Sequence, residues 1–339
     1  TVIAREQTYV HTFYKKEATA QQPATSKEEG NLVAFSGPDF KATFDKQSGL
    51  LTSYLYKKQE YILNGQGPRP FFWRAPTDND YGANLPVRLK AWKEASYQEP
   101  KAESFQVTPG SNATTVKVIY RFPQTDARWD ITYKIYASGV IKVDNRFVAE
   151  GDQAPMIPRV GLRMQLPESF TDLTYYGRGP KENYRDRRTS QFIGEYAIPV
   201  KDMYEPYVRP QENNHRTDIY WCALTDKTQR GLLLIADRTF ELNASNYPLE
   251  SMDSGDTIDN GAPRTEKTHH RHLTDPLPEK MVDLFIDYRM MGVGGDDSWG
   301  ATAHEPYLIR PGKENAIEYG FSLVPFDKKE DYKYLIRQY

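Results

Sequence analysis

The stretch WDITYKIYASGVIKV, residues 129–143, decides the expected fold. Its large apolar side chains occupy every second position from Trp129 to Ile135, with polar residues between them. The short segment 137–139 carries turn residues, and a second apolar run follows at 140–143. A period of two turns one face of a strand to a core and the other to solvent, so the stretch predicts two strands joined by a turn.

The same pattern recurs along most of the chain. Further strand-like runs lie at 40–44, 116–122, 160–166, 231–235, 282–288 and 316–323. Turn residues separate these runs, and only 87–95 has a persuasive helical pattern. Strands without intervening helices exclude βαβ units. We therefore expect an all-β fold, a large antiparallel β-sandwich with one or two short helices.

The N-terminal segment differs from the rest in composition. Residues 15–30 are polar, poor in large apolar side chains, and cannot contribute to a core. The chain also begins at Thr1, without Met. We expect residues 1–30 to be the end of a preceding module plus a tether, and residues 31–339 to be the main domain.

Composition excludes several classes of function. The chain has 339 residues, 44 Lys and Arg against 46 Asp and Glu, and a net charge of -2, which argues against a nucleic-acid binder. No apolar run approaches the roughly 20 residues that a membrane span needs. The single cysteine, Cys222, excludes an intrachain disulfide and a cysteine-based zinc cluster.

Two dense patches are candidates for a site. Residues 71–82, FFWRAPTDNDYG, run from an aromatic triplet into an oxygen-rich turn, which is either a cation or sugar-hydroxyl site or a self-bonded Asx turn. Residues 291–300, MGVGGDDSWG, lack the Lys-Ser/Thr of a phosphate loop and carry two acids, so we reject phosphate binding. Their glycines are able to project Trp299 as a platform for a sugar ring, although core packing is the ordinary role of a Trp.

Two other patches favour structural roles. Residues 175–187, YYGRGPKENYRDR, lack the context of a dinucleotide site and are expected to form a buried ion-pair corner. Residues 269–272, HHRH, have no nearby carboxylate, so we assign no metal to them.

Taken together, the patches resemble one family. The motifs FWRAPTDND (72–80), GRGPKENYRDR (177–187), DMYEPYVRPQEN (202–213), HRHL (270–273) and GVGGDDSW (292–299) occur in the order found in the C-terminal domain of bacterial β-galactosidases of glycoside hydrolase family two. The resemblance covers about residues 31–325. It implies the large sandwich shared with aldose mutarotases, and it makes residues 1 to about 14 similar to the end of an immunoglobulin-like linker domain.

The resemblance implies how such a chain takes part in catalysis. In that family both catalytic glutamates lie in an upstream barrel domain, so we expect no catalytic residue and no activity in this segment alone. The resemblance implies that Trp299 stacks on the sugar and that the loop from Gly82 through Ala83 and Asn84 borders the substrate. Residues expected to support these loops are Arg74, Asp78, Asn79, Asp80, Asp296 and Asp297.

Cofactors and partners follow from the same resemblance. We expect no metal or cofactor in this segment, with Mg²⁺ and Na⁺ held by the absent catalytic domain. The expected partners are a galactoside, the barrel domain and further copies of the complete enzyme; a bacterial cytoplasmic or periplasmic location stays open. Two alternatives remain: a non-catalytic carbohydrate-binding module, or a stand-alone aldose mutarotase or epimerase using His215 or His304 with a nearby Glu.

Overall fold

The fold is taken from a computed structural model of the chain. It describes residues 6–8, 21–150, 156–255, 272–297, 300–310, 312, 314, 316–327 and 332–338. Within these ranges, no helix has the length and apolar character needed to cross a membrane.

A small antiparallel sheet forms one layer. Its strands follow the chain order: β1 (Thr25–Glu29), β2 (Leu32–Ser36), β3 (Phe40–Asp45), β4 (Leu51–Tyr56) and β5 (Gln59–Glu60). Strand β1 lies in the expected tether, yet it pairs with β2 from Thr25↔Ser36 to Glu29↔Leu32. The tether prediction is therefore wrong for residues 25–29: a polar strand fully exposed on its side chains still joins a sheet edge through its backbone.

A larger antiparallel sheet of 12 strands forms the other layer and curls around it. Its main path runs β13-β12-β14-β15-β17-β10-β9-β8-β7. Strand β16 also pairs with β15, β11 pairs with β16, and β6 pairs with β11. The strands are β6 (Arg69–Phe71), β7 (Ala102–Thr108), β8 (Thr114–Phe122), β9 (Ala127–Ile135), β10 (Ile141–Ala149), β11 (Arg159–Pro167), β12 (Asp172–Gly179), β13 (Phe192–Pro199), β14 (Arg216–Thr225), β15 (Gly231–Ser245), β16 (Met281–Met290) and β17 (Ile317–Phe326).

The expected antiparallel sandwich is confirmed. Strands β9 and β10 pair from Ile135↔Ile141 to Ala127↔Ala149, as the stretch 129–143 predicts. The other predicted runs correspond to strands β3, β8, β11, β15, β16 and β17. Strands β12, β13 and β14 were not predicted.

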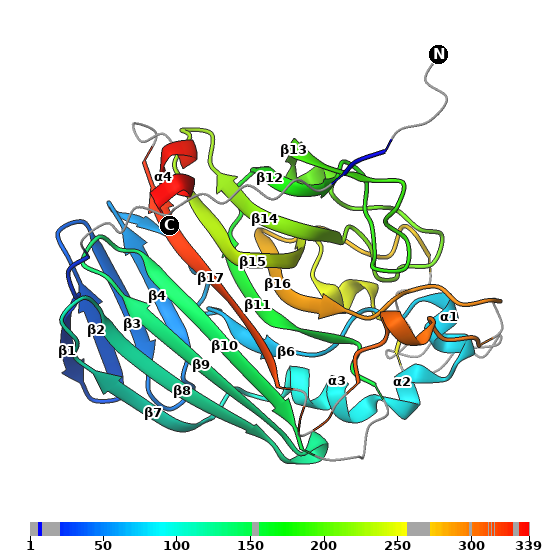
Figure 1. Ribbon diagram of the computed structural model, residues 1–339, viewed down its shortest axis with the longest axis horizontal. Helices are drawn as coiled ribbons and strands as arrows, with labels where there is room; N and C mark the ends of the chain where they lie inside the picture. Colours follow the sequence, from blue (N-terminus) through cyan, green and yellow to red (C-terminus); the bar gives the residue numbers. More distant parts are fainter. Residues whose placement is uncertain are drawn as a thin grey trace.

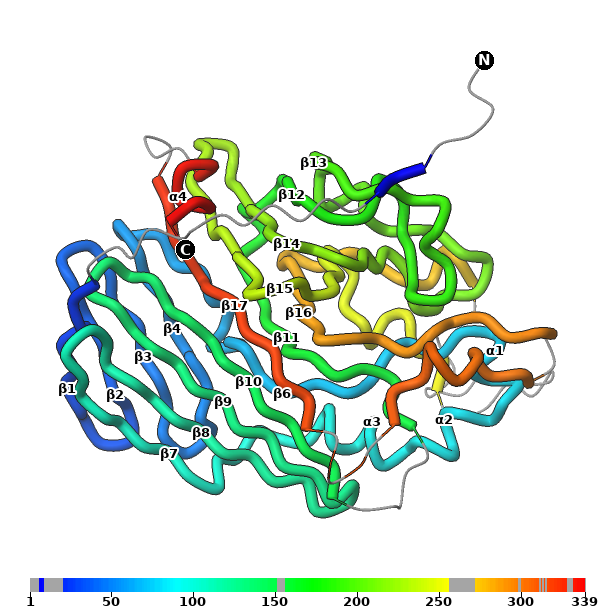
Figure 2. Tube along the Cα trace, in the orientation of Figure 1, coloured from blue at the N-terminus to red at the C-terminus, as the bar shows by residue number. Residues whose placement is uncertain are grey.

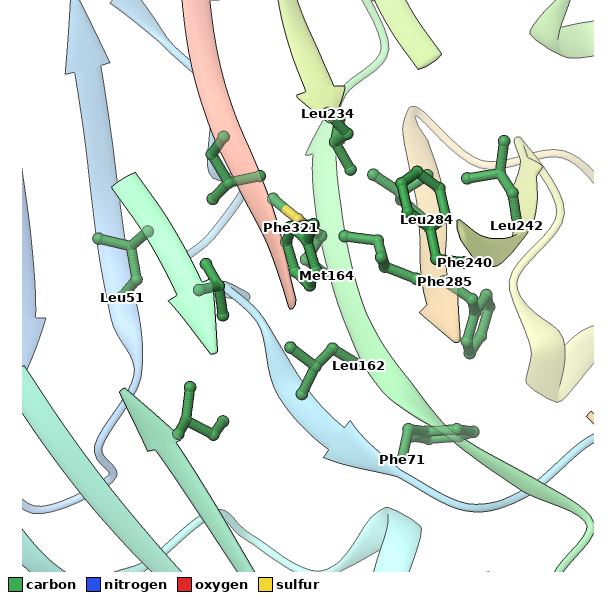
Figure 3. Packing of buried hydrophobic residues seen from close by; sticks show 14 of the residues in the cluster. Leu51, Phe71, Leu162, Met164, Leu234, Phe240, Leu242, Leu284, Phe285 and Phe321 are labelled. Atoms are coloured by element: carbon green, nitrogen blue, oxygen red, sulfur yellow. The ribbon is translucent and has the colours of Figure 1, made fainter. Parts of the chain in front are cut away.

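The core lies between the two layers. On the small sheet Phe44 places its ring 5.0 Å from Tyr133 of the large sheet, measured between ring centroids, and both are fully buried. Figure 3 shows that the core continues past β17, with Phe321 of β17 and Met164 of β11 both among its buried residues. Burial of this apolar surface is the main force that holds the layers together.

Three short helices connect β6 to β7 and cover one end of the sandwich (Figure 1). They are α1 (Asp78–Gly82), α2 (Leu85–Arg88) and α3 (Lys90–Tyr97). The single predicted helix at 87–95 is therefore two helices, interrupted at Leu89, and the expected Asp-Asn-Asp turn is helical. The ring centroid of Trp92 in α3 lies 5.1 Å from that of Phe72, and the Phe72 centroid lies 5.5 Å from that of Trp129 in β9. These contacts fix the helices to the large sheet.

The remaining helical elements are short. A fourth α-helix, α4 (Tyr332–Gln338), follows β17, and single 3-10 turns lie at η1 (Pro123–Thr125), η2 (Val200–Asp202), η3 (Leu249–Met252) and η5 (Glu305–Tyr307). The described N-terminal residues lie beside β13 (Figure 2), where the Gln7 side chain both donates to and accepts from the backbone of Ile193, at 2.8 and 2.7 Å.

Candidate functional site

The two sequence patches meet in space at one end of the sandwich. We call this contact the junction; it consists of residues 74–84 together with 291–297 and Gly300. Its first part is α1, whose start is fixed by a capping box. The Thr77 hydroxyl accepts from the Asp80 N–H at 3.2 Å, and the Asp80 carboxylate accepts from the Thr77 N–H at 3.0 Å. This reciprocal pair satisfies amide donors that have no partner inside the helix.

A buried arginine connects α1 to the glycine-rich segment. Arg74 donates to both carboxylate oxygens of Asp80, at 3.0 and 2.7 Å, and the two side chains are almost completely buried. The same guanidinium donates to the carbonyls of Met291 at 2.7 Å and Gly292 at 3.0 Å. Arg74 therefore holds segments more than two hundred residues apart in one arrangement.

Asp186 approaches the glycine-rich segment from the loop after β12. Its carboxylate accepts from the Gly294 N–H at 2.7 Å. A Cβ added at Gly292 would lie 2.6 Å from that carboxylate, which is closer than real Cβ atoms come. Glycine at 292 is therefore required for the approach of Asp186, whose role the sequence analysis missed.

The two parts of the junction touch through their backbones. Gly300 has a φ of +131°, and a Cβ there would lie 2.7 Å from the Gly82 carbonyl oxygen. Glycine is thus required twice over, by the backbone angle and by the close approach. Gly82 and Asn84 are exposed and Ala83 is partly exposed, so the predicted substrate-side residues lie at the surface beside the glycine-rich segment.

The predicted support residues separate into two groups. Arg74 and Asp80 are buried in the junction, whereas Asp78 is exposed and pairs with Arg209 at 3.2 Å. Asn79 contributes its carbonyl to the Ala83 N–H at 2.9 Å, which ends α1.

The acids of the glycine-rich segment bond locally. Asp296 pairs with His304 at 2.8 Å, and Asp297 accepts from the Ala301 N–H at 3.2 Å. Trp299 lies outside the described residues, as do 269–271 of the HHRH patch.

The patch 175–187 forms the predicted ion-pair corner. Asp218 of β14 receives Arg178 at 2.7 Å and Arg188 at 2.9 Å, while Arg185 reaches Glu241 at 3.1 Å. These contacts join the loop after β12 to β14 and β15, which confirms the structural interpretation of the patch.

A buried charged pair lies behind this corner. His215 is fully buried, with Nδ1 2.7 Å from Asn243 and Nε2 3.0 Å from Glu241. Burial alone lowers the pKa of His215, but the hydrogen bond and charge of Glu241 outweigh it and raise that pKa. Burial raises the pKa of Glu241, but the hydrogen bond and charge of His215, together with Arg185 and the Met290 N–H, outweigh it and lower that pKa. Both shifts favour the charged forms of the two groups.

This geometry bears on the epimerase alternative. Acid–base catalysis on a sugar needs an imidazole within reach of a hydroxyl group. Both ring nitrogens of His215 are engaged inside the protein. His304 is exposed, but in the described part of the chain its side-chain partner is Asp296 rather than a glutamate. Neither histidine forms the accessible His–Glu pair that this alternative expects.

Asp287 is the least satisfied acid of this cluster. It is fully buried, 3.2 Å from the Arg159 Nε, and neither carboxylate oxygen has a hydrogen-bond partner among the described residues. Burial, only partly offset by Arg159, raises the pKa of Asp287 to about 7. The sequence signal was the pair of acids, Asp283 and Asp287, inside the otherwise apolar run 282–288, and it was missed.

Comparison with known proteins identifies the family. The model of the beta galactosidase small chain matches residues 36–323, which is most of the chain. The chain belongs to the beta-galactosidase small chain family.

Curated relatives of this small chain are bacterial enzymes of greater length. A beta-galactosidase from Priestia megaterium is 33% identical over 86% of this chain, and one from Lactobacillus delbrueckii subsp. bulgaricus is 32% identical over 88%. A beta-galactosidase from Streptococcus thermophilus is 26% identical over 94%. The small chain covers 26%, 28% and 29% of these three relatives, respectively.

Comparison with solved structures finds more distant similarities. A galactose 1-epimerase from Lactobacillus acidophilus NCFM is 5% identical, with a TM-score of 0.49, and the match covers 91% of this chain and 99% of that one. An aldose epimerase homologue from C. elegans is 10% identical, with a TM-score of 0.42, covering 85% and 96%. Identities this low say nothing of a shared reaction.

The contribution of Arg74 to the stability of the junction can be tested by mutation. Arg74→Ala removes the partner of a buried carboxylate and leaves two loop carbonyls unpaired, so we expect a loss of about 3–5 kcal/mol in the free energy of unfolding. Urea denaturation measures this loss. The matched control is Arg209→Ala, which breaks the exposed pair with Asp78 and should cost less than about 1 kcal/mol. Equal losses in the two variants would contradict the role given to Arg74.

The raised pKa of Asp287 predicts a pH effect with a definite sign. The folded state holds this proton up to about pH 7, whereas the unfolded state releases it near the ordinary value of 3.8. The stability contribution of Asp287 therefore falls between about pH 4 and 7 and stays low above that window. Asp287→Asn cannot ionise, so its unfolding free energy relative to the parent should rise from pH 5 to pH 8 by about 3 kcal/mol, most of it below pH 7. Thermal unfolding at both pH values tests this, and an unchanged difference would contradict it.

Proposed function

We propose that this chain is the C-terminal part of a beta-galactosidase and that its junction forms one wall of the substrate pocket in the complete enzyme. The family membership supports the parent activity. The position of Gly82, Ala83 and Asn84 at the surface, next to the segment that leads to Trp299, supports the role of the junction.

One observation carries the proposal: the backbone contact between Gly300 and Gly82. It joins the residue that follows Trp299 to the first residue of the predicted substrate-side loop. Arg74 fixes the bases of both segments through Asp80 and the carbonyls of 291 and 292. A wall anchored in this way is preorganised, so little conformational entropy is lost when a ligand binds to it.

The chemistry of the wall is recognition. An indole offers an apolar face with negative quadrupole charge, which suits the C–H side of a galactose ring. The exposed Asn84 side chain offers hydrogen bonds to hydroxyl groups, since the backbone N–H groups of Ala83 and Asn84 are already bonded to the carbonyls of Asn79 and Tyr81. Bond cleavage in this proposal belongs to two glutamates in a domain outside this chain, one acting as acid/base and the other as nucleophile in a retaining mechanism.

Metals and assembly are also assigned to the complete enzyme. Within the described ranges, no three His, Cys, Asp or Glu side chains gather closely enough to hold a metal ion. The family resemblance, and not this absence, is the ground on which we place Mg²⁺ and Na⁺ in the domain outside this chain. Association of complete enzymes into a homo-oligomer is part of the same proposal.

Replacing the indole tests the proposed wall. In the complete enzyme, Trp299→Ala should lower kcat/KM for a galactoside by about 30- to 150-fold, the equivalent of a stacking contact worth roughly 2–3 kcal/mol. Steady-state kinetics with lactose measure this. Trp299→Phe, which keeps an aromatic face, is the matched control and should retain most of the rate. A kcat/KM unchanged in the alanine variant would refute the assignment.

The isolated chain gives a second test. Without an acid/nucleophile pair it should release no nitrophenol from a nitrophenyl β-galactoside above the buffer rate. Adding the separately expressed upstream domains should restore turnover if the chain contributes a wall. Turnover by the chain alone would show that its own carboxylates perform the cleavage.

A further inference from the structure

The large sheet forks at β15, and the fork opens a trough. The first half of β15, Gly231–Ala236, pairs with β17, and its last part, Glu241–Ser245, pairs with β16. Residues 237–240 between them pair with neither strand. Figure 1 shows β16 and β17 diverging on the curled side of the sheet. A trough of about 730 Å³ lies there, lined from β8, β9, β10, β14, β15, β16 and β17 and by Arg185 of the loop after β12.

The trough shares no residue with the junction. Its lining carries six carboxylates and five Lys or Arg side chains. Several of these pair with one another, as Arg146 does with Glu318 at 3.4 Å and Lys117 with Asp130 at 3.4 Å. This near balance of charge disfavours a phosphate, which six acids repel, and a divalent cation, which the five basic groups repel.

Side chains that are fixed and able to bond hydroxyl groups form the inner wall. Glu241 is almost fully buried and held by Arg185 at 3.1 Å, by the Met290 N–H at 2.8 Å and by His215. A carboxylate has about four acceptor positions, so one remains for a ligand. Tyr288 and Tyr319 lie with ring centroids 6.1 Å apart, both partly exposed, and add an aromatic surface.

One buried group in the lining lacks a partner. Asn145 is 4% exposed, and its Oδ1 accepts from the Trp129 indole at 3.0 Å. Its Nδ2 has no hydrogen-bond acceptor among the described residues. A buried amide donor left unpaired is costly, so a ligand that accepts from Asn145 would recover free energy.

We propose that this trough binds a short, uncharged saccharide. A sugar hydroxyl donates and accepts at once, so it bonds to acids and bases together, whereas an ion is repelled by one of the two sets. The partly exposed rings of Tyr288 and Tyr319 suit the apolar face of a pyranose. The volume lies in the range of pockets that enclose small organic ligands. The proposal is independent of the wall proposed for the junction.

Titration calorimetry of the 339-residue chain with lactose tests the trough. We expect binding, weakened by about tenfold in Arg289→Ala and in Tyr288→Leu, because each loses one direct contact. Both side chains are only partly buried, and within the described ranges Arg289 has no ion pair, so the variants should fold; circular dichroism checks this. The matched control is Arg121→Ala, an exposed residue of β8 outside the trough, which should bind as the parent does.

Further measurements distinguish binding at the trough from binding at the junction. Loss of lactose binding by the isolated chain in Trp299→Ala, with no loss in Tyr288→Leu, would overturn the trough assignment. Absence of lactose binding by the parent chain would also overturn it, without bearing on the kinetics of the complete enzyme. Displacement of lactose by inorganic phosphate beyond that by sodium chloride at equal ionic strength would overturn the neutral-ligand assignment.

Discussion

The arrangement of the candidate site depends on one buried guanidinium. Arg74 is almost completely buried, so its donors must find acceptors within the protein. Asp80 supplies the countercharge, and two carbonyls of the glycine-rich segment complete the set. A charge buried in this way cannot shift without losing several bonds at once, which fixes α1 and the segment at 291–292 relative to each other.

The same constraint extends beneath the junction. The Arg159 N–H donates to the Phe72 carbonyl at 3.0 Å, and its guanidinium lies between Glu212 and Asp287. Glu212 in turn donates its N–H to the Ala75 carbonyl at 3.1 Å. The backbone from 72 to 75 is therefore held on both sides by charged residues of other segments. This explains why a stretch that is followed by only short helices keeps a defined path.

Strands with one buried face are the clearest to predict from sequence, although β11 and β16, which are buried on both faces, were found from their apolar runs and the alternating β12 was missed. Strands β8, β9 and β10 alternate strictly between core and solvent, so their period is visible. Strand β14 is buried along most of both faces, which removes the alternation, and it was missed. Helix α1 was missed although Thr77-x-x-Asp80 is a capping-box pattern, because the Asp-Asn-Asp run favours a turn equally well. The support by Arg74 and Asp80 was expected from family resemblance, whereas Asp186 and Asp287 needed the three-dimensional contacts.

The fork at β15 explains why the junction and the trough are built differently. At the gap between β16 and β17, the strands on either side present an unpaired edge or an open face. No neighbouring strand covers the side chains there. Ile317–Gly320 of β17 pair with β10 alone, so charged and aromatic side chains, rather than backbone, must line the gap. At the junction the opposite holds, since two glycines let backbone meet backbone. Residues scattered over seven strands leave no local pattern, which is why no sequence motif marks the trough.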